Sequence, residues 1–88
     1  MSRLFNTYKN LTASAVVKAQ PGILRGMYVN STTAGTIKFW DNASAGSGTV
    51  INNTITPAIG WHALGDGTTT NGIFATIGGT LDVTVYYE

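Results

Sequence analysis

The C-terminal part of the chain alternates between apolar and other side chains with a period of two residues. Within the segment 80–87, one side carries Leu81, Val83, Val85 and Tyr87. Within the segment 72–78, the corresponding set is Ile73, Ala75 and Ile77. This period is typical of β-strands with one buried face. Gly78-Gly79 separates the two runs, and because glycine readily adopts the positive φ of primed turns, we predict a two-residue hairpin there.

The same pattern predicts strands earlier in the chain. In the segment 35–41, Ile37 and Phe39 point to one side. The segment 23–30 is also strand-like, but the Arg25-Gly26 pair interrupts both of its faces, which predicts a β-bulge. Turn signals recur about every 8–12 residues, a spacing typical of a sandwich or barrel. We therefore expect six to eight short antiparallel strands and no helix of normal length, with weaker strands at 14–19, 49–55 and 61–64.

Composition supports the all-β prediction. Thr, Ile and Val supply 27 of the 88 residues, and these β-branched side chains pack well on a pleated surface. The length fits a single domain. We expect residues 13–88 to form the β-sandwich domain and residues 1–12 to form an N-terminal arm or edge strand.

The charge content is low, at 10% of the residues with a net charge of +1. The five basic residues form no cluster, and nucleic-acid binding depends on neutralising several phosphates together, so we expect no direct nucleic-acid partner. A near-neutral surface promotes association, and a chain this small buries only about 60–65% of its unfolded surface. Both features favour a homo-oligomer.

The first residues contain no apolar run of signal-peptide length, and no stretch approaches the roughly 20 apolar residues of a membrane helix. We therefore expect a soluble chain, with no membrane partner, that is made and used without export through a cleaved signal. The absence of cysteine excludes disulfides and thiolate metal sites.

Candidate catalytic chemistry is sparse. His62 is the only histidine, and Asp41, Asp66 and Asp82 are isolated in sequence. A hydrolytic triad needs a nucleophile, a base and an orienting acid, and a metal site needs several ligands. We expect a structural or solvent-facing His62, and no catalytic, metal or cofactor site.

The aromatic residues are more informative. If Ile37, Phe39, Ile73 and Ile77 point into the core, alternation places Trp40, Phe74 and Tyr86 on the opposite face. Large apolar groups on an outer face mark interaction surfaces. The alternative is that a loop or the N-terminal arm of the same chain covers them, and the sequence leaves both interpretations open.

Three segments in a fixed order resemble a group of small structural proteins of tailed bacteriophages. They are VVKAQPGILRGMYVNS (16–31), GTIKFWDNASAGSGTVI (35–51) and NGIFATIGGTLDVTVYY (71–87). The resemblance covers about residues 13–88, and Trp40 stands where these proteins usually carry a smaller aromatic residue. It implies a compact jelly-roll-like β-sandwich in the virion that works as a homo-oligomer, often a trimer.

The resemblance implies a non-enzymatic capsid decoration (cement) protein that is made in the host bacterial cytoplasm and bridges major capsid subunits at the capsid surface, and the low charge agrees with this role. The arm would reach a neighbouring subunit through Arg3, Leu4, Phe5 and Tyr8, and the outer aromatics would add Trp40, Trp61, Phe74 and Tyr86 to the interface. One alternative is a glycan-binding module on a head fibre or tail, with Trp40, Trp61 and Tyr86 stacking on sugar rings. A second alternative is a head–tail or tail component.

Overall fold

The computed structural model describes residues 7–88, which contain six β-strands and no helix. The predicted all-β class is therefore confirmed. The strands are β1 (Thr7–Leu11), β2 (Ala15–Lys18), β3 (Ile23–Asp41), β4 (Thr49–Ile55), β5 (Gly60–Thr68) and β6 (Ile73–Tyr87). They are joined by antiparallel pairing into one sheet.

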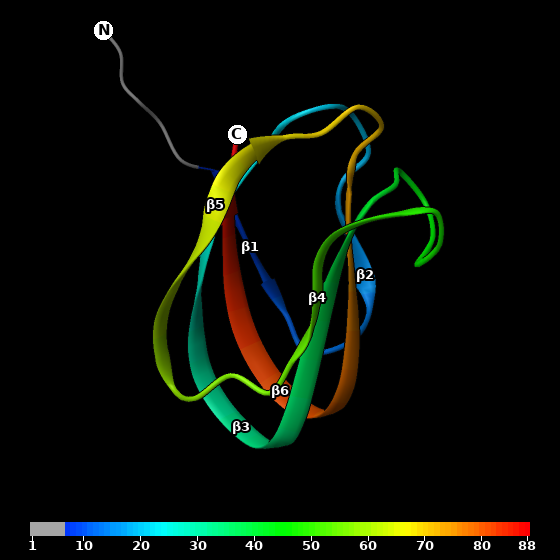
Figure 1. Ribbon diagram of the computed structural model, residues 1–88. Helices are drawn as coiled ribbons and strands as arrows, with labels where there is room; N and C mark the ends of the chain where they lie inside the picture. The colour runs from blue at the N-terminus through cyan, green and yellow to red at the C-terminus, as the bar shows by residue number, and fades with distance from the viewer. Residues whose placement is uncertain (1–6) are drawn as a thin grey trace, which may run out of the picture.

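Two strands are much longer than the sequence pattern predicts. β3 has 19 residues and β6 has 15, and each runs through a position where we expected a turn. The predicted hairpin at Gly78-Gly79 is wrong, because β6 continues through both glycines. The two long strands instead bend together at the bottom of Figure 1. At the bend, the register shifts between Thr33 and Thr36 of β3, with Ala34 at φ 53° and Gly79 of the facing strand at φ +65°.

The bend folds the single sheet into two layers that share β3 and β6 (Figure 1). In the first layer, β1 pairs with the C-terminal half of β6, and β5 pairs with the N-terminal half of β3. In the second layer, β2 pairs with the N-terminal half of β6, and β4 pairs with the C-terminal half of β3. Each layer is thus four strands wide, as in a sandwich, although no break separates the two layers into independent sheets.

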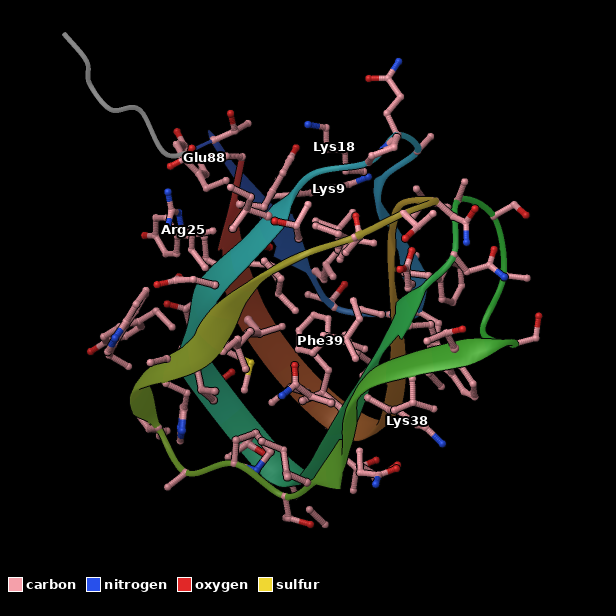
Figure 2. All side chains as sticks on the ribbon, turned by 45° about the horizontal axis from the view of Figure 1, so that its top comes forward. Lys9, Lys18, Arg25, Lys38, Phe39 and Glu88 are labelled. Carbon is pink, nitrogen blue, oxygen red and sulfur yellow. The ribbon has the colours of Figure 1, made fainter. Side chains whose placement is uncertain are left out.

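The core lies between the layers and is almost entirely aliphatic. Thirteen hydrophobic residues are buried there, and Phe39 is the one aromatic side chain among those described. Phe39 lies near the centre of the molecule in Figure 2. The most completely buried aliphatic side chains come from β3 and β6, including Leu24, Met27, Ile73 and Val83. The two bent strands therefore supply most of the apolar contact that stabilises the fold.

The bulge predicted near Arg25 is confirmed. The register of β3 shifts between Leu24 and Gly26 against both β5 and β6. Because the bulge adds a residue, Leu24 and Met27 are both buried although they are three positions apart. The Arg25 guanidinium is directed to Glu88 Oε2, at 3.0 Å from Nε and 2.6 Å from Nη2, and the two residues are neighbours in Figure 2.

Strand β5 extends further than expected, through residues 65–68, so the loop before β6 is short. Asp41, the last residue of β3, holds this loop. Its carboxylate accepts hydrogen bonds from the backbone N–H groups of Thr70 (2.9 Å), Asn71 (2.8 Å) and Gly72 (3.3 Å). Desolvation alone would raise the pKa of Asp41, but the three N–H donations outweigh it, so the pKa lies below its ordinary value.

Candidate interaction surface

Four aromatic side chains lie on the outer side of the first layer, and we call this surface the aromatic face. It consists of Tyr8, Tyr28, Trp61 and Tyr86, which come from four adjacent strands. Tyr8 is paired with Tyr86 across β1 and β6, and Tyr28 is paired with Trp61 across β3 and β5. The ring centroids are 6.0 Å apart for Tyr8 and Tyr86 and 5.6 Å apart for Trp61 and Tyr86. A continuous aromatic row therefore crosses the layer.

Gly26 makes this row possible. It lies between Tyr86 of β6 and Ala63 of β5 in the register, and a Cβ atom there would be 2.5 Å from the Trp61 indole. Because glycine has no side chain, the indole lies directly on the β3 backbone and reaches Tyr86. The rings are tilted by 47° in the Tyr8–Tyr86 pair and by 60° in the Trp61–Tyr86 pair. The aromatic face is consequently stepped rather than flat.

The aromatic face is open to solvent. The exposed fraction is 68% for Tyr8, 55% for Trp61 and 44% for Tyr28. Tyr86 is half-buried because its two aromatic neighbours flank it. Exposed aromatic rings at this density are typical of binding surfaces, since each ring combines a large apolar area with few rotatable bonds.

A hydrogen-bonded polar row adjoins the aromatic face on the same side of the layer. Thr84 is paired with Asn10 on one side and with Tyr28 on the other. Asp82 Oδ1 accepts hydrogen bonds from the side-chain amides of Asn10 (2.8 Å) and Asn30 (3.1 Å). The Thr84 hydroxyl also accepts from these amides, at 3.4 Å and 3.2 Å. These contacts fix four polar side chains beside the aromatic rings, and we call the set Asn10, Asn30, Asp82 and Thr84 the polar row.

The outer side of the second layer also carries an apolar row, but the chain covers part of it. Val16, Phe74, Trp40 and Val50 are paired in that order across β2, β6, β3 and β4, and all are half-buried. A Cβ atom on Gly46 would be 3.2 Å from Trp40 Nε1 and 3.5 Å from Phe74 Cε1. The loop between β3 and β4 therefore lies against both rings.

Asn42 shapes this covering loop. Its side-chain oxygen accepts hydrogen bonds from the N–H groups of Ser44 (2.8 Å) and Ala45 (2.9 Å). Its amide donates to the carbonyl of Ser47 at 3.0 Å. Asparagine commonly organises turns in this way. Of the two interpretations that the sequence left open for the outer aromatics, cover by the same chain describes Trp40 and Phe74.

The residues predicted for the interface thus fall into three groups. Tyr8, Trp61 and Tyr86 are brought together on the aromatic face. Trp40 and Phe74 lie on the other layer. Arg3, Leu4 and Phe5 lie outside the described residues, as does the first half of the proposed arm, whereas residues 7–11 form the edge strand β1.

Sequence reasoning missed Tyr28 and the polar row. Tyr28 could have been found, because it lies between the inward-facing Met27 and Val29 and alternation places it outside. The hydrogen-bond partners of Asp82 could not have been found from the sequence, because Asn10 and Asn30 are separated from it by 72 and 52 residues.

The titratable side chains of His62, Asp66 and Asp82 each contact a different part of the protein. His62 Nε2 lies 2.8 Å from the carbonyl of Ala58, in the connection that precedes β5. Asp66 lies 3.5 Å from Arg25, whereas Asp82 accepts hydrogen bonds from the amides of Asn10 and Asn30. Within residues 7–88, no group of three or more His, Asp and Glu side chains could hold a metal ion, and no helix is long and apolar enough to cross a membrane.

Comparison with known proteins adds no assignment. No protein-family model, no curated protein and no solved structure matches this chain.

Proposed function

We propose that this chain is a non-enzymatic structural protein of a tailed-phage virion, a capsid decoration protein that oligomerises and bridges capsid subunits. One observation carries the proposal: five large hydrophobic side chains of the described residues are exposed to solvent. Phe39 is the one aromatic residue among the buried core residues, while Tyr8, Tyr28, Ile55, Ile59 and Trp61 are exposed. The resemblance of three sequence segments to phage structural proteins supports the virion setting.

The placement of these side chains favours a partner surface over a free one. The chain has nine charged residues in 88, so few charges separate the exposed apolar groups. Protein interfaces are enriched in aromatic side chains and depleted of charge at their centres. An interface of this composition would depend on the burial of apolar surface, so salt would change its affinity little.

The dimensions suit a bridging role. A standard interface uses about 800 Å² of each partner, and the chain exposes 4500 Å². Two such contacts would therefore leave more than half of the surface free. Repetition of modest contacts over many copies around a capsid would then supply the overall strength by multivalency.

Reconstitution on phage heads that lack this protein tests the proposal. We expect the purified chain to co-sediment with the heads, to saturate at a fixed copy number, and to remain bound at high salt. Ile59→Ser removes a side chain that is 64% exposed, and we expect it to weaken attachment by about tenfold, the equivalent of one lost apolar contact of 1.4 kcal/mol.

Thr56→Ser on the same β4–β5 connection is the matched control and should bind as wild type does. Failure of the wild-type protein to co-sediment would contradict the proposal. So would attachment that disappears at high salt, because it would indicate an electrostatic contact.

A further inference from the structure

We propose that the aromatic face together with the polar row forms a binding site for a neutral pyranose glycan. The site would add a recognition function to the structural role, and its chemistry does not depend on that role. Three features of the first layer carry the inference: the exposed rings, the fixed polar groups beside them and the scarcity of charge around both.

The rings supply the apolar contacts that a sugar needs. The faces of pyranose rings are lined by C–H groups, and an aromatic face carries partial negative charge that attracts them. Trp61 and Tyr28 are paired across β3 and β5, and Trp61 and Tyr86 are 5.6 Å apart. Because the rings are tilted, they cannot lie together against one flat surface. They suit a twisted, soluble oligosaccharide in which successive sugar units each contact a different ring.

The polar row supplies hydrogen-bonding groups at the edge of the same rings. The amide N–H₂ groups of Asn10 and Asn30 donate to Asp82 and Thr84. Within residues 7–88, no donor forms a hydrogen bond to the side-chain oxygens of Asn10 and Asn30, and the Thr84 hydroxyl, which accepts from both amides, has its own hydrogen to donate. Sugar hydroxyls donate and accept, so they complement this mixed set without requiring the side chains to rearrange.

The charges favour a neutral ligand. Asp82 is the single charged residue of the two sets that form the site. The nearest basic residues along β1 and β3 are engaged elsewhere, with Lys9 donating to the Val16 carbonyl at 2.7 Å and Arg25 bound to Glu88. Phosphate-bearing ligands depend on Lys and Arg contacts, so a neutral glycan fits this surface better than a nucleic acid does.

The chain provides an internal comparison. The apolar row of the second layer lies under the loop between β3 and β4, where Gly46 approaches both Trp40 and Phe74. The aromatic face keeps two rings more than half exposed, at 68% for Tyr8 and 55% for Trp61. The two tryptophans of the protein therefore occupy different settings, and a single spectrum can report on both.

A nuclear magnetic resonance titration of the full-length ¹⁵N-labelled protein tests the proposal. Maltohexaose, cellohexaose and chitohexaose are the probes, each added to millimolar concentration. The chain has two tryptophans, so the indole region contains two N–H signals, and the Trp61→Ala spectrum assigns them. We expect at least one probe to shift the Trp61 signal in a saturable manner. The Trp40 signal should stay in place, because that indole donates to Thr76 on the other layer.

Single substitutions in and outside the proposed site provide a second test of glycan binding. We expect Tyr28→Ala to weaken binding by roughly tenfold, the loss of one aromatic contact, and Asp82→Asn to weaken it severalfold. Ile59→Ala, which removes an exposed apolar side chain outside both sets, should bind as wild type does. Trp61→Ala should abolish glycan binding, whereas Ile59→Ser, which we expect to weaken attachment to phage heads, should leave glycan binding unchanged, and this difference separates the two proposals.

Two results would overturn the proposal. The first is the absence of any shift of the Trp61 signal with all three probes. The second is a Trp61 signal that moves with protein concentration alone and not with sugar, because that behaviour would identify the aromatic face as a contact between copies of this chain.

Discussion

At the scale of single residues, two glycines lie at positions where a Cβ atom would collide with neighbouring atoms. Gly26 lets the Trp61 indole lie on the backbone of β3. Gly79 adopts φ +65°, and a Cβ atom there would collide with the carbonyl oxygen of Ala34 on the facing strand. The first glycine shapes the aromatic face, and the second allows β3 and β6 to bend together.

Replacing Gly79 by alanine should therefore destabilise the fold. A left-handed backbone costs a residue with a Cβ atom about 1–2 kcal/mol, and the contact with Ala34 adds to this. We expect Gly79→Ala to lower the free energy of unfolding by roughly 2 kcal/mol or more, measured by urea denaturation followed by circular dichroism.

Gly67→Ala is the matched control for this substitution. Gly67 has no positive φ, and a Cβ atom there would have open space within 4 Å. Its effect should stay within about 0.5 kcal/mol. Equal losses in the two variants would show that the bend does not depend on the conformation of Gly79.

Asp41 predicts a pH dependence of stability. Its pKa in the folded chain is lowered, because three backbone N–H donations outweigh desolvation. A lowered pKa contributes stability that is present above the unfolded value of about 3.9 and is lost as the pH falls through the folded value. Asp41→Asn should therefore cost about 1 kcal/mol at pH 7, a low figure because solvent screens these bonds.

At about pH 2 this difference should disappear, because the wild-type carboxyl is then protonated in both states. Urea denaturation at the two pH values measures it. Asp66→Asn is the control, since the Asp66 side chain is 61% exposed and lies 3.5 Å from the Arg25 guanidinium, and it should change stability little. A penalty for Asp41→Asn that persists unchanged at low pH would contradict the role given to the charge.

At the scale of the strands, alternation predicted the faces better than the connections. It placed Leu81, Val83 and Val85 inside correctly, and the bounds expected for the fourth strand are those observed. It misread Gly78-Gly79, because a glycine pair breaks the pattern in the same way whether the chain reverses or bends. The outcome depends on Ala34-Gly35 of the facing strand, a partner more than forty residues away that local sequence does not identify.

Strand β1 gives a direct test of how an edge strand joins the core. Its first four residues are exposed and Leu11 is 4% exposed. Leu11→Ala should lower the free energy of unfolding by about 2–3 kcal/mol, the usual range for a buried leucine. Thr7→Ala on the same strand should change it by less than about 0.5 kcal/mol. If Leu11→Ala lowered the free energy of unfolding as little as Thr7→Ala does, in both thermal and urea unfolding, β1 would not be part of the cooperative fold.

At the scale of the whole molecule, bending one sheet creates two outer faces with different chemistry. The second face is apolar and partly covered by its own loop, whereas the first exposes aromatic rings beside a polar row. Alternation along the strands could indicate that aromatic side chains such as Trp40, Phe74 and Tyr86 would lie on outer faces. It could not indicate which of them would meet, since Tyr8, Tyr28, Trp61 and Tyr86 come from four strands brought together by the fold.

We propose that this chain is a structural component of a phage particle. A cryo-electron microscopy map of phage heads reconstituted with the purified chain tests this proposal most directly. We predict ordered density for the folded sheet at repeated positions on the capsid surface, with the exposed apolar side chains, such as Ile59, in contact with neighbouring subunits. A well-resolved particle without density for this chain on its capsid would contradict the account.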